Sequence, residues 1–158
     1  MIDSRDLRIL IELAKDARTP LTHIARILNI SDVAVKKRLE RLEREGVIKG
    51  YVINVNPRLL GFTRIALIGV NVEPGKILDV ARKIADMKES VFVALTSGDH
   101  DVMVEVWCKD SEELANIIDR IRRLPGVKDI FPAIILELIK EREPFPIRKL
   151  IEDIFKER

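Results

Sequence analysis

The stretch TSGDHD, residues 96–101, places one imidazole between two carboxylates. Side chains of these types can bind a metal ion, act as an acid and base pair, or stand solvated in a turn. Adjacent side chains in a turn point in different directions, whereas a zinc site needs three or four converging ligands. The other histidine, His23, lies 77 positions away in a different predicted domain. The sequence therefore argues against a metal site at this turn. A repressor that responds to a metal ion remains an alternative.

The rest of the chain contains no catalytic constellation. No glycine-rich phosphate loop follows a predicted strand, and no nucleophile elbow is present. The single cysteine, Cys108, can form neither an internal disulfide nor a cysteine cage for a metal, which is typical of a reducing compartment. We expect a protein that is not an enzyme, has no catalytic residues and carries no cofactor.

The composition indicates a globular protein. With 158 residues and 47% hydrophobic residues, the chain is long enough for one ordinary domain or two small ones. No apolar run approaches the roughly 20 residues that a membrane span needs, and no signal peptide opens the chain. We therefore expect a cytoplasmic protein without a membrane partner. A charged fraction of 34% and the absence of glutamine indicate a hot environment.

Three short helices are predicted in the first fifty residues. Apolar positions recur at helical spacing in residues 4–15, 20–28 and 32–44. Each predicted helix is preceded by a capping residue, namely Asp3, Thr19 and Ser31. The apolar stripe expected on the first helix consists of Leu7, Leu10, Ile11 and Ala14.

The positive charge of the chain is concentrated near the third predicted helix. The net charge is only +2, but residues 20–50 hold seven Lys or Arg against four acids. One face of the third helix carries the apolar seam of Val35, Leu39 and Leu42, and the other is basic. A basic face alone is also typical of a solvated helix. Two short helices joined by a tight turn at Asn29, with the second one basic outward, predict a helix-turn-helix that enters the major groove of double-stranded DNA.

Gly46 then leads into an alternating apolar segment, which predicts a strand. The runs IDSRDLRILIELAKDARTP and ISDVAVKKRLERLEREGVIKGYVINVNPRLLGF, with SGDHD and PAIILE further on, resemble the Lrp/AsnC (feast/famine) family of transcription regulators, and its archaeal members most closely. The resemblance covers residues 2–140 and implies that the third helix reads DNA. Its early residues would then lie nearest base edges: Ser31, Asp32, Val33, Ala34, Lys36 and Lys37. Three arginines would meet phosphates: Arg38, Arg41 and Arg44. Arg38 could instead pair with nearby glutamates.

The second half of the chain predicts a βαββαβ order. The expected elements are strand 62–72, helix 77–85, strands 91–96 and 102–108, helix 114–121 and strand 127–139. The fold class is therefore α+β, with an N-terminal helix-turn-helix domain joined to a C-terminal ferredoxin-like domain. The family resemblance implies that the first domain is winged and that the second is of the RAM type. Both faces of strand 102–108 are apolar, whereas helices cover only one face of such a sheet. We expect a second copy of the chain to cover the other face in a homodimer.

The family resemblance gives residues 96–101 a further interpretation. It implies dimers that can gather into octamers and an amino-acid-like effector bound around a motif that matches Gly98, Asp99, His100 and Asp101. A glycine allows a ligand close to the backbone, and a carboxylate can accept hydrogen bonds from an ammonium group. Many relatives have a hydroxyl side chain in the last strand where this chain has Pro132. A plain turn with solvated acids therefore remains the alternative. A stand-alone small-molecule-binding or oligomeric interaction protein also remains, although it would not need the basic helix.

The domain borders follow from turn residues and the change of period. We expect a DNA-binding domain at 1–50, a strand and linker at 51–61, an oligomerisation and effector domain at 62–140 and a C-terminal amphipathic helix within 141–158. The apolar stripe of this last helix is Ile147, Leu150, Ile151, Ile154 and Phe155. We expect it to dock on the same domain or on a neighbouring subunit.

Overall fold

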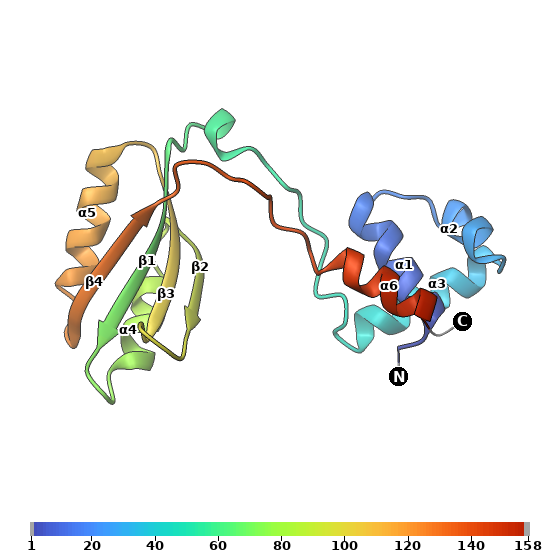
Figure 1. Ribbon diagram of the computed structural model, residues 1–158, viewed down its shortest axis with the longest axis horizontal. Helices are drawn as coiled ribbons and strands as arrows, with labels where there is room; N and C mark the ends of the chain where they lie inside the picture. Colours follow the sequence, from blue (N-terminus) through green and yellow to red (C-terminus); the bar gives the residue numbers. More distant parts are fainter. Residues whose placement is uncertain (1, 157–158) are drawn as a thin grey trace. The chain divides into compact units, whose positions relative to one another are not determined.

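The computed structural model describes residues 2–156, which divide into two compact units. One unit contains the residues up to Asn54 together with those from Lys140 onward, and the other contains Val55–Ile139. The chain therefore passes between the units twice. The first and the last helix belong to the same unit (Figure 1).

The first unit begins with three short helices, as predicted: α1 (Ser4–Lys15), α2 (Leu21–Leu28) and α3 (Asp32–Arg44). Asn29 takes the left-handed conformation, with φ 52°, in the turn between α2 and α3. Asparagine tolerates this region better than most residues, so the tight turn has a local cause. The helices share a buried core of Ile9, Ile24, Ala25, Leu28 and Val35.

One predicted cap is wrong, and the burial along α1 includes a residue outside the predicted stripe. Thr19 does not cap α2, because its hydroxyl donates to the backbone oxygen of Asp16 at 2.7 Å. Pro20 occupies the N-cap position in an extended conformation, so the helix begins one residue later than predicted. On α1, Ile9 is fully buried and Ile11 is nearly so. Three other members of the predicted stripe are only half-buried: Leu7, Leu10 and Ala14.

The C-terminal helix α6 (Ile147–Lys156) lies along α1 and covers its second apolar side (Figure 1). Ile154 of α6 and Ile11 of α1 are 6% and 5% exposed, and neither belongs to the core that α1 shares with α2 and α3. The tail thus packs on the helical unit and not on the domain that precedes it in the chain. The side chains of Asp153, Phe155 and Lys156, and all of residues 157–158, lie outside the described part, so the prediction for Phe155 is not placed. Within residues 2–156, no helix is long and apolar enough to cross a bilayer.

The strand predicted after α3 is not formed. Residues 51–56 have neither helical nor strand structure, and Val52 and Ile53 are 90% and 85% exposed. A strand needs a neighbour for its ladder of hydrogen bonds. Among the described residues of this unit no second strand provides one. A short 3₁₀ helix, η1 (Pro57–Leu60), then opens the second unit.

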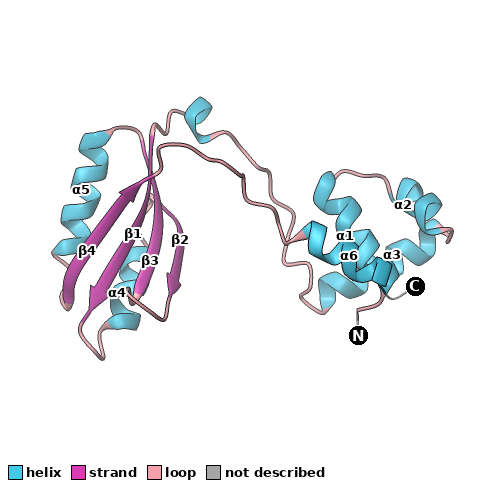
Figure 2. Cartoon of the chain, in the orientation of Figure 1, coloured by secondary structure: helices cyan, strands magenta, loops and turns pink. Residues whose placement is uncertain are grey.

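The second unit has the predicted βαββαβ order (Figure 2). Its elements are β1 (Arg64–Val72), α4 (Ile77–Ala85), β2 (Ser90–Leu95), β3 (Val102–Cys108), α5 (Ser111–Arg122) and β4 (Val127–Ile134). The antiparallel sheet has the order β2-β3-β1-β4, and both helices cover the same face. β4 ends at Ile134, five residues earlier than predicted. β1 begins at Arg64, so the residues beyond Ile135 have no strand beside them.

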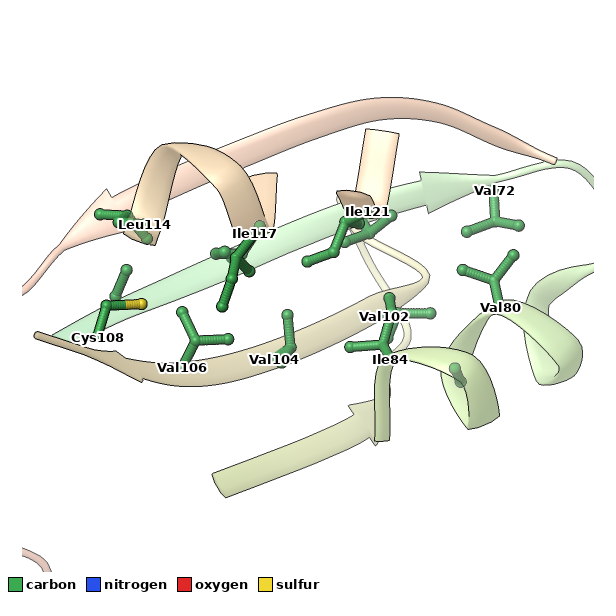
Figure 3. Close-up of a cluster of buried hydrophobic side chains, with 14 residues drawn as sticks. Val72, Val80, Ile84, Val102, Val104, Val106, Cys108, Leu114, Ile117 and Ile121 are labelled. Carbon is green, nitrogen blue, oxygen red and sulfur yellow. The ribbon is translucent and has the colours of Figure 1, made fainter. Parts of the chain in front are cut away.

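The helix-covered face of the sheet forms the main core (Figure 3). Four side chains of β3 on this face are completely buried: Val102, Val104, Val106 and Cys108. They meet Val80 and Ile84 from α4 and Ile117 and Ile121 from α5. Burial, together with the negative charge of Glu113, Glu89 and Asp110, raises the pKa of the Cys108 thiol to about 11. Cys108 is therefore an unreactive core residue.

No described helix of this unit covers the other face of the sheet. Met103 and Trp107 lie on it, as predicted from the alternation of β3. The cross-strand partners of β3 and β1 on this face include Phe92, Ala94 and Phe131. Phe92 and Phe131 are 46% and 48% exposed. Apart from the buried Glu105, which accepts from the Trp107 indole N–H at 2.8 Å, this open face is largely apolar, and the exposure of its aromatic side chains is unusual.

Candidate functional site

The outward side of α3 carries the residues predicted to contact DNA. Ser31 caps the helix by accepting from the Ala34 N–H at 3.2 Å, so its hydroxyl is already engaged at the helix start. Val33 is 58% exposed, so its side chain is accessible to a partner. Four further members of the predicted set are exposed to solvent: Asp32, Lys36, Lys37 and Arg44. Ala34 is half-buried.

Arg38 and Arg41 differ from the other predicted residues because both form ion pairs with carboxylates at the start of α1. Nη1 of Arg38 donates to Oδ2 of Asp3 at 2.7 Å and to Oδ1 of Asp6 at 2.8 Å. Nη2 of Arg41 donates to Oδ2 of Asp6. Their side chains are 25% and 29% exposed. The two arginines therefore connect α3 to the first turn of α1.

Asp6 is the centre of this cluster, and its side chain is completely buried. Its carboxylate also accepts from the Asp3 N–H at 3.0 Å, which completes the capping box of α1. Burial alone raises the pKa of Asp6, but the hydrogen bonds from Asp3, Arg38 and Arg41 outweigh burial and hold this pKa below its ordinary value. The carboxylate is therefore ionised at neutral pH and matches the two guanidinium groups.

The capping role of Asp3 and Asp6 follows from the sequence, but their contact with α3 does not. The arginines lie more than thirty positions further along the chain. One signal was available, because Asp6 precedes the buried Ile9 by three residues and so shares its side of α1. An acid on the core side of a helix requires a cationic or hydrogen-bonding partner.

The turn at residues 98–101 joins β2 to β3. Gly98 has φ 122°, a conformation that favours glycine. The Asp101 carboxylate accepts from the Val72 N–H at 2.8 Å. This N–H lies where the β1–β4 register shifts, so Asp101 satisfies a donor next to the irregularity. Asp101 therefore has a structural role in the sheet.

His100 lies over the open face of the sheet. Its ring centroid is 4.8 Å from that of Phe131, and Nδ1 is 3.2 Å from Oδ1 of Asn71. Gly69 provides the space for the ring, since a Cβ on Gly69 would lie within 2.7 Å of Nε2. By contrast, Asp99 is exposed, and its carboxylate makes no hydrogen bond or ion pair with any described residue.

Pro132 is not on the same face as His100. It pairs with the core residue Ile68, whereas the neighbouring Phe131 pairs with Gly69 beneath the imidazole. β4 is an edge strand, which is where a sheet tolerates the missing N–H of proline. The residue of the last strand beside His100 is therefore Phe131. Among residues 2–156, no three His, Cys, Asp or Glu side chains come together as a metal site.

Two family models match the two parts of the chain. The model described as Lrp/AsnC ligand binding domain matches residues 65–145, and the winged helix-turn-helix DNA-binding model matches residues 2–49. The chain belongs to the Lrp/AsnC family. It is therefore a DNA-binding transcriptional regulator and not an enzyme. Helix α6 begins after the end of both matched stretches.

Curated relatives agree with this Lrp/AsnC assignment, and a solved structure shares the fold. The HTH-type transcriptional regulator LrpA of Pyrococcus abyssi is 47% identical over 141 residues, which are 89% of this chain and 100% of LrpA. The regulator FL11 of Pyrococcus furiosus is 35% identical over 148 residues, or 94% of this chain and 98% of FL11. The structure of E. coli AsnC has a TM-score of 0.83 at 24% identity and covers 90% of this chain and 97% of AsnC.

A further structural neighbour was solved with a small molecule. A transcriptional regulator from Neisseria meningitidis, in complex with L-methionine, has a TM-score of 0.86 at 20% identity. The match covers 95% of this chain and 99% of that one. At this identity the likeness shows the shared fold alone.

Proposed function

We propose that this Lrp/AsnC regulator reads a double-stranded DNA operator with the exposed side of α3. Base edges meet the early residues of the helix, namely Ser31, Asp32, Val33, Ala34, Lys36 and Lys37. Arg44 meets a phosphate. The observation that carries this proposal is the exposed cationic side of a capped helix behind a tight turn. We also propose that the protein acts in the cytoplasm, together with its DNA partner.

We propose further that the protein acts as a homodimer formed through the open face of the sheet. This face includes Phe92 and Phe131, each about half exposed, and it carries Met103 and Trp107. A second copy related by a two-fold axis is the simplest cover for such a patch. Two copies of α3 then require an inverted-repeat operator with half-sites about 34–36 Å apart or a multiple of that spacing. Dimers can assemble further into octamers.

The turn at residues 98–101 is the proposed site for an amino-acid-like effector. The unpaired carboxylate of Asp99 can accept hydrogen bonds from an ammonium group, and Gly98 leaves room near the backbone. His100 borders the same surface. Binding there acts on DNA through linkage, because an effector that prefers one assembly of subunits shifts the population toward it. The alternative is a constitutive regulator with a solvated turn.

Binding to duplex DNA tests the proposed role of α3. Operators are selected from random duplexes, and affinity is measured by fluorescence anisotropy over a series of salt concentrations. Substitution K37A should cost about 1–3 kcal/mol on the selected operator and relax its specificity. The matched control is K83A, which removes an exposed lysine from α4 and should change nothing. A wild-type protein that binds no duplex at low salt would overturn the proposal.

Titration with the twenty amino acids tests the effector site. A bound effector should raise the melting temperature and change the operator affinity. Asp99→Asn should abolish both responses and leave the protein without ligand unchanged. If no amino acid shifts either measurement, the effector proposal fails and the DNA-binding proposal stands.

A further inference from the structure

Asp6 on α1 binds both arginines that point away from the exposed side of α3. Its Oδ1 accepts from Arg38, and its Oδ2 accepts from Arg41. Asp3 adds a second acceptor for Arg38 at 2.7 Å. The terminal nitrogens that bond α1 are therefore not free to meet a phosphate at the same time.

Arg41 is nevertheless close to the side of α3 that faces DNA in the proposed function. It lies one helical turn from Lys37 and one from Arg44, both of which are exposed. Its Nε is buried and makes no hydrogen bond with any described atom. A buried N–H without an acceptor is costly, so the inward position of Arg41 depends on the bond to Asp6. Without that bond, an outward rotation would let the whole guanidinium find acceptors.

We propose that Asp6 is a specificity-determining residue, which anchors α3 to α1 and withholds Arg38 and Arg41 from the DNA phosphates. The inference rests on the proposed role of α3 in reading DNA. Phosphate contacts add affinity on every sequence and carry no sequence information, whereas base readout depends on the placement of α3. Asp6 thus limits binding to random DNA and preserves binding to the operator.

The first test compares Asp6→Asn with the wild type in the full-length protein. Each released arginine that meets a phosphate should steepen the slope of log K against log salt by about 0.9. We therefore expect D6N to bind a random-sequence duplex several-fold more tightly, with a steeper slope, and to show a lower ratio of operator to random affinity. The control is D16N, because Asp16 is an exposed acid at the end of the same helix and its substitution changes the net charge equally. An equal change in D16N, or an unchanged ratio in D6N, would overturn the inference.

The second test leaves Asp6 intact and does not depend on the folding of D6N. R44Q and R41Q remove the same charge from the same helix, three residues apart. We expect R44Q to reduce the salt slope by about 1, and R41Q to leave the slope unchanged because Arg41 contacts no phosphate. Equal losses in R41Q and R44Q would refute the withholding of Arg41. If the wild type and R44Q have the same salt slope, Arg44 contacts no phosphate, and the proposed role of α3 fails instead.

Discussion

The imidazole of His100 occupies the space above Gly69 that a side chain on β1 would need. A Cβ at Gly69 would come within 2.7 Å of Nε2 and within 2.6 Å of Cγ. The ring is also held by Asn71 and lies against Phe131. Gly69 of β1 has no side chain and thus leaves the space in which the β2–β3 turn places His100.

Gly69→Ala should move the His100 ring away from Phe131. An alanine is favoured over glycine within a strand by roughly 0.5–1 kcal/mol, which offsets part of the steric cost, so global stability should change little. The measurement is the NMR shift of the His100 ring protons, which should lose the ring-current effect of Phe131. His23, the other histidine, is the internal control. Unchanged His100 signals would contradict the observed close approach.

Substitutions of Asp101 and Asp99 should distinguish a structural role from a binding role. Asp101→Ala leaves the Val72 N–H without its acceptor and should lower the free energy of unfolding by about 1–3 kcal/mol. Asp99→Ala removes an exposed acid and should stay within about 0.5 kcal/mol of the wild type. Urea unfolding measures both. Equal effects of the two variants would show that the Asp101 bond does not hold the sheet.

The buried Ile154 should make α6 a stabilising part of the helical unit. Ile154→Ala should lower the free energy of unfolding of this unit by about 2–4 kcal/mol. The control is Lys149→Ala, an exposed position on the same helix. Deletion of residues 144–158 should have at least the effect of the Ile154 substitution. Unchanged stability and assembly size after that deletion would show that α6 does not dock.

The Asp6 cluster should contribute to the acid limb of the stability curve. Because the pKa of Asp6 is lowered on folding, its contribution is fully present above the unfolded-state pKa of about 4 and is lost as the pH falls through the lower folded-state value. Urea unfolding of wild type and D6N over a pH series measures this contribution. The difference between the two proteins should shrink with acidification. A difference that is constant with pH would mean that the charge of Asp6 is not what stabilises the contact.

Tyr51 provides a probe at alkaline pH. Partial burial and the hydrogen bond to Glu43 at 2.8 Å raise the pKa of Tyr51 to about 12. The stability linked to this shift is present below about pH 10 and is lost as the pH rises toward the folded-state value. Tyr51 is the single tyrosine, so its absorbance titration is unambiguous. Glu43→Gln should move the midpoint down toward 10, and an unmoved midpoint would mean that Glu43 does not hold the hydroxyl.

The spacing of apolar residues, together with the capping residues, was enough to predict most elements. β3 runs from Val102 to Cys108, as its period of two indicates, and α3 begins after Ser31, as its cap indicates. These signals are local, because period and capping depend on neighbours within one or two turns of the chain. The apolar segment at 51–56 failed as a strand for the same reason. Its sequence is suitable, but pairing depends on a partner that sequence pattern does not provide.

Short-range signals predicted the helix-turn-helix, the βαββαβ order and most, but not all, of the residues exposed on α3, because periodicity, caps and turn residues act over short distances. The tertiary structure was needed to show that Asp6 bonds Arg38 and Arg41, that Gly69 lies beneath His100 and that Pro132 lies on the opposite face of the sheet. It also decided that α6 packs on α1. These relationships join residues far apart in the chain, and only the packing and pairing of whole elements bring such residues together.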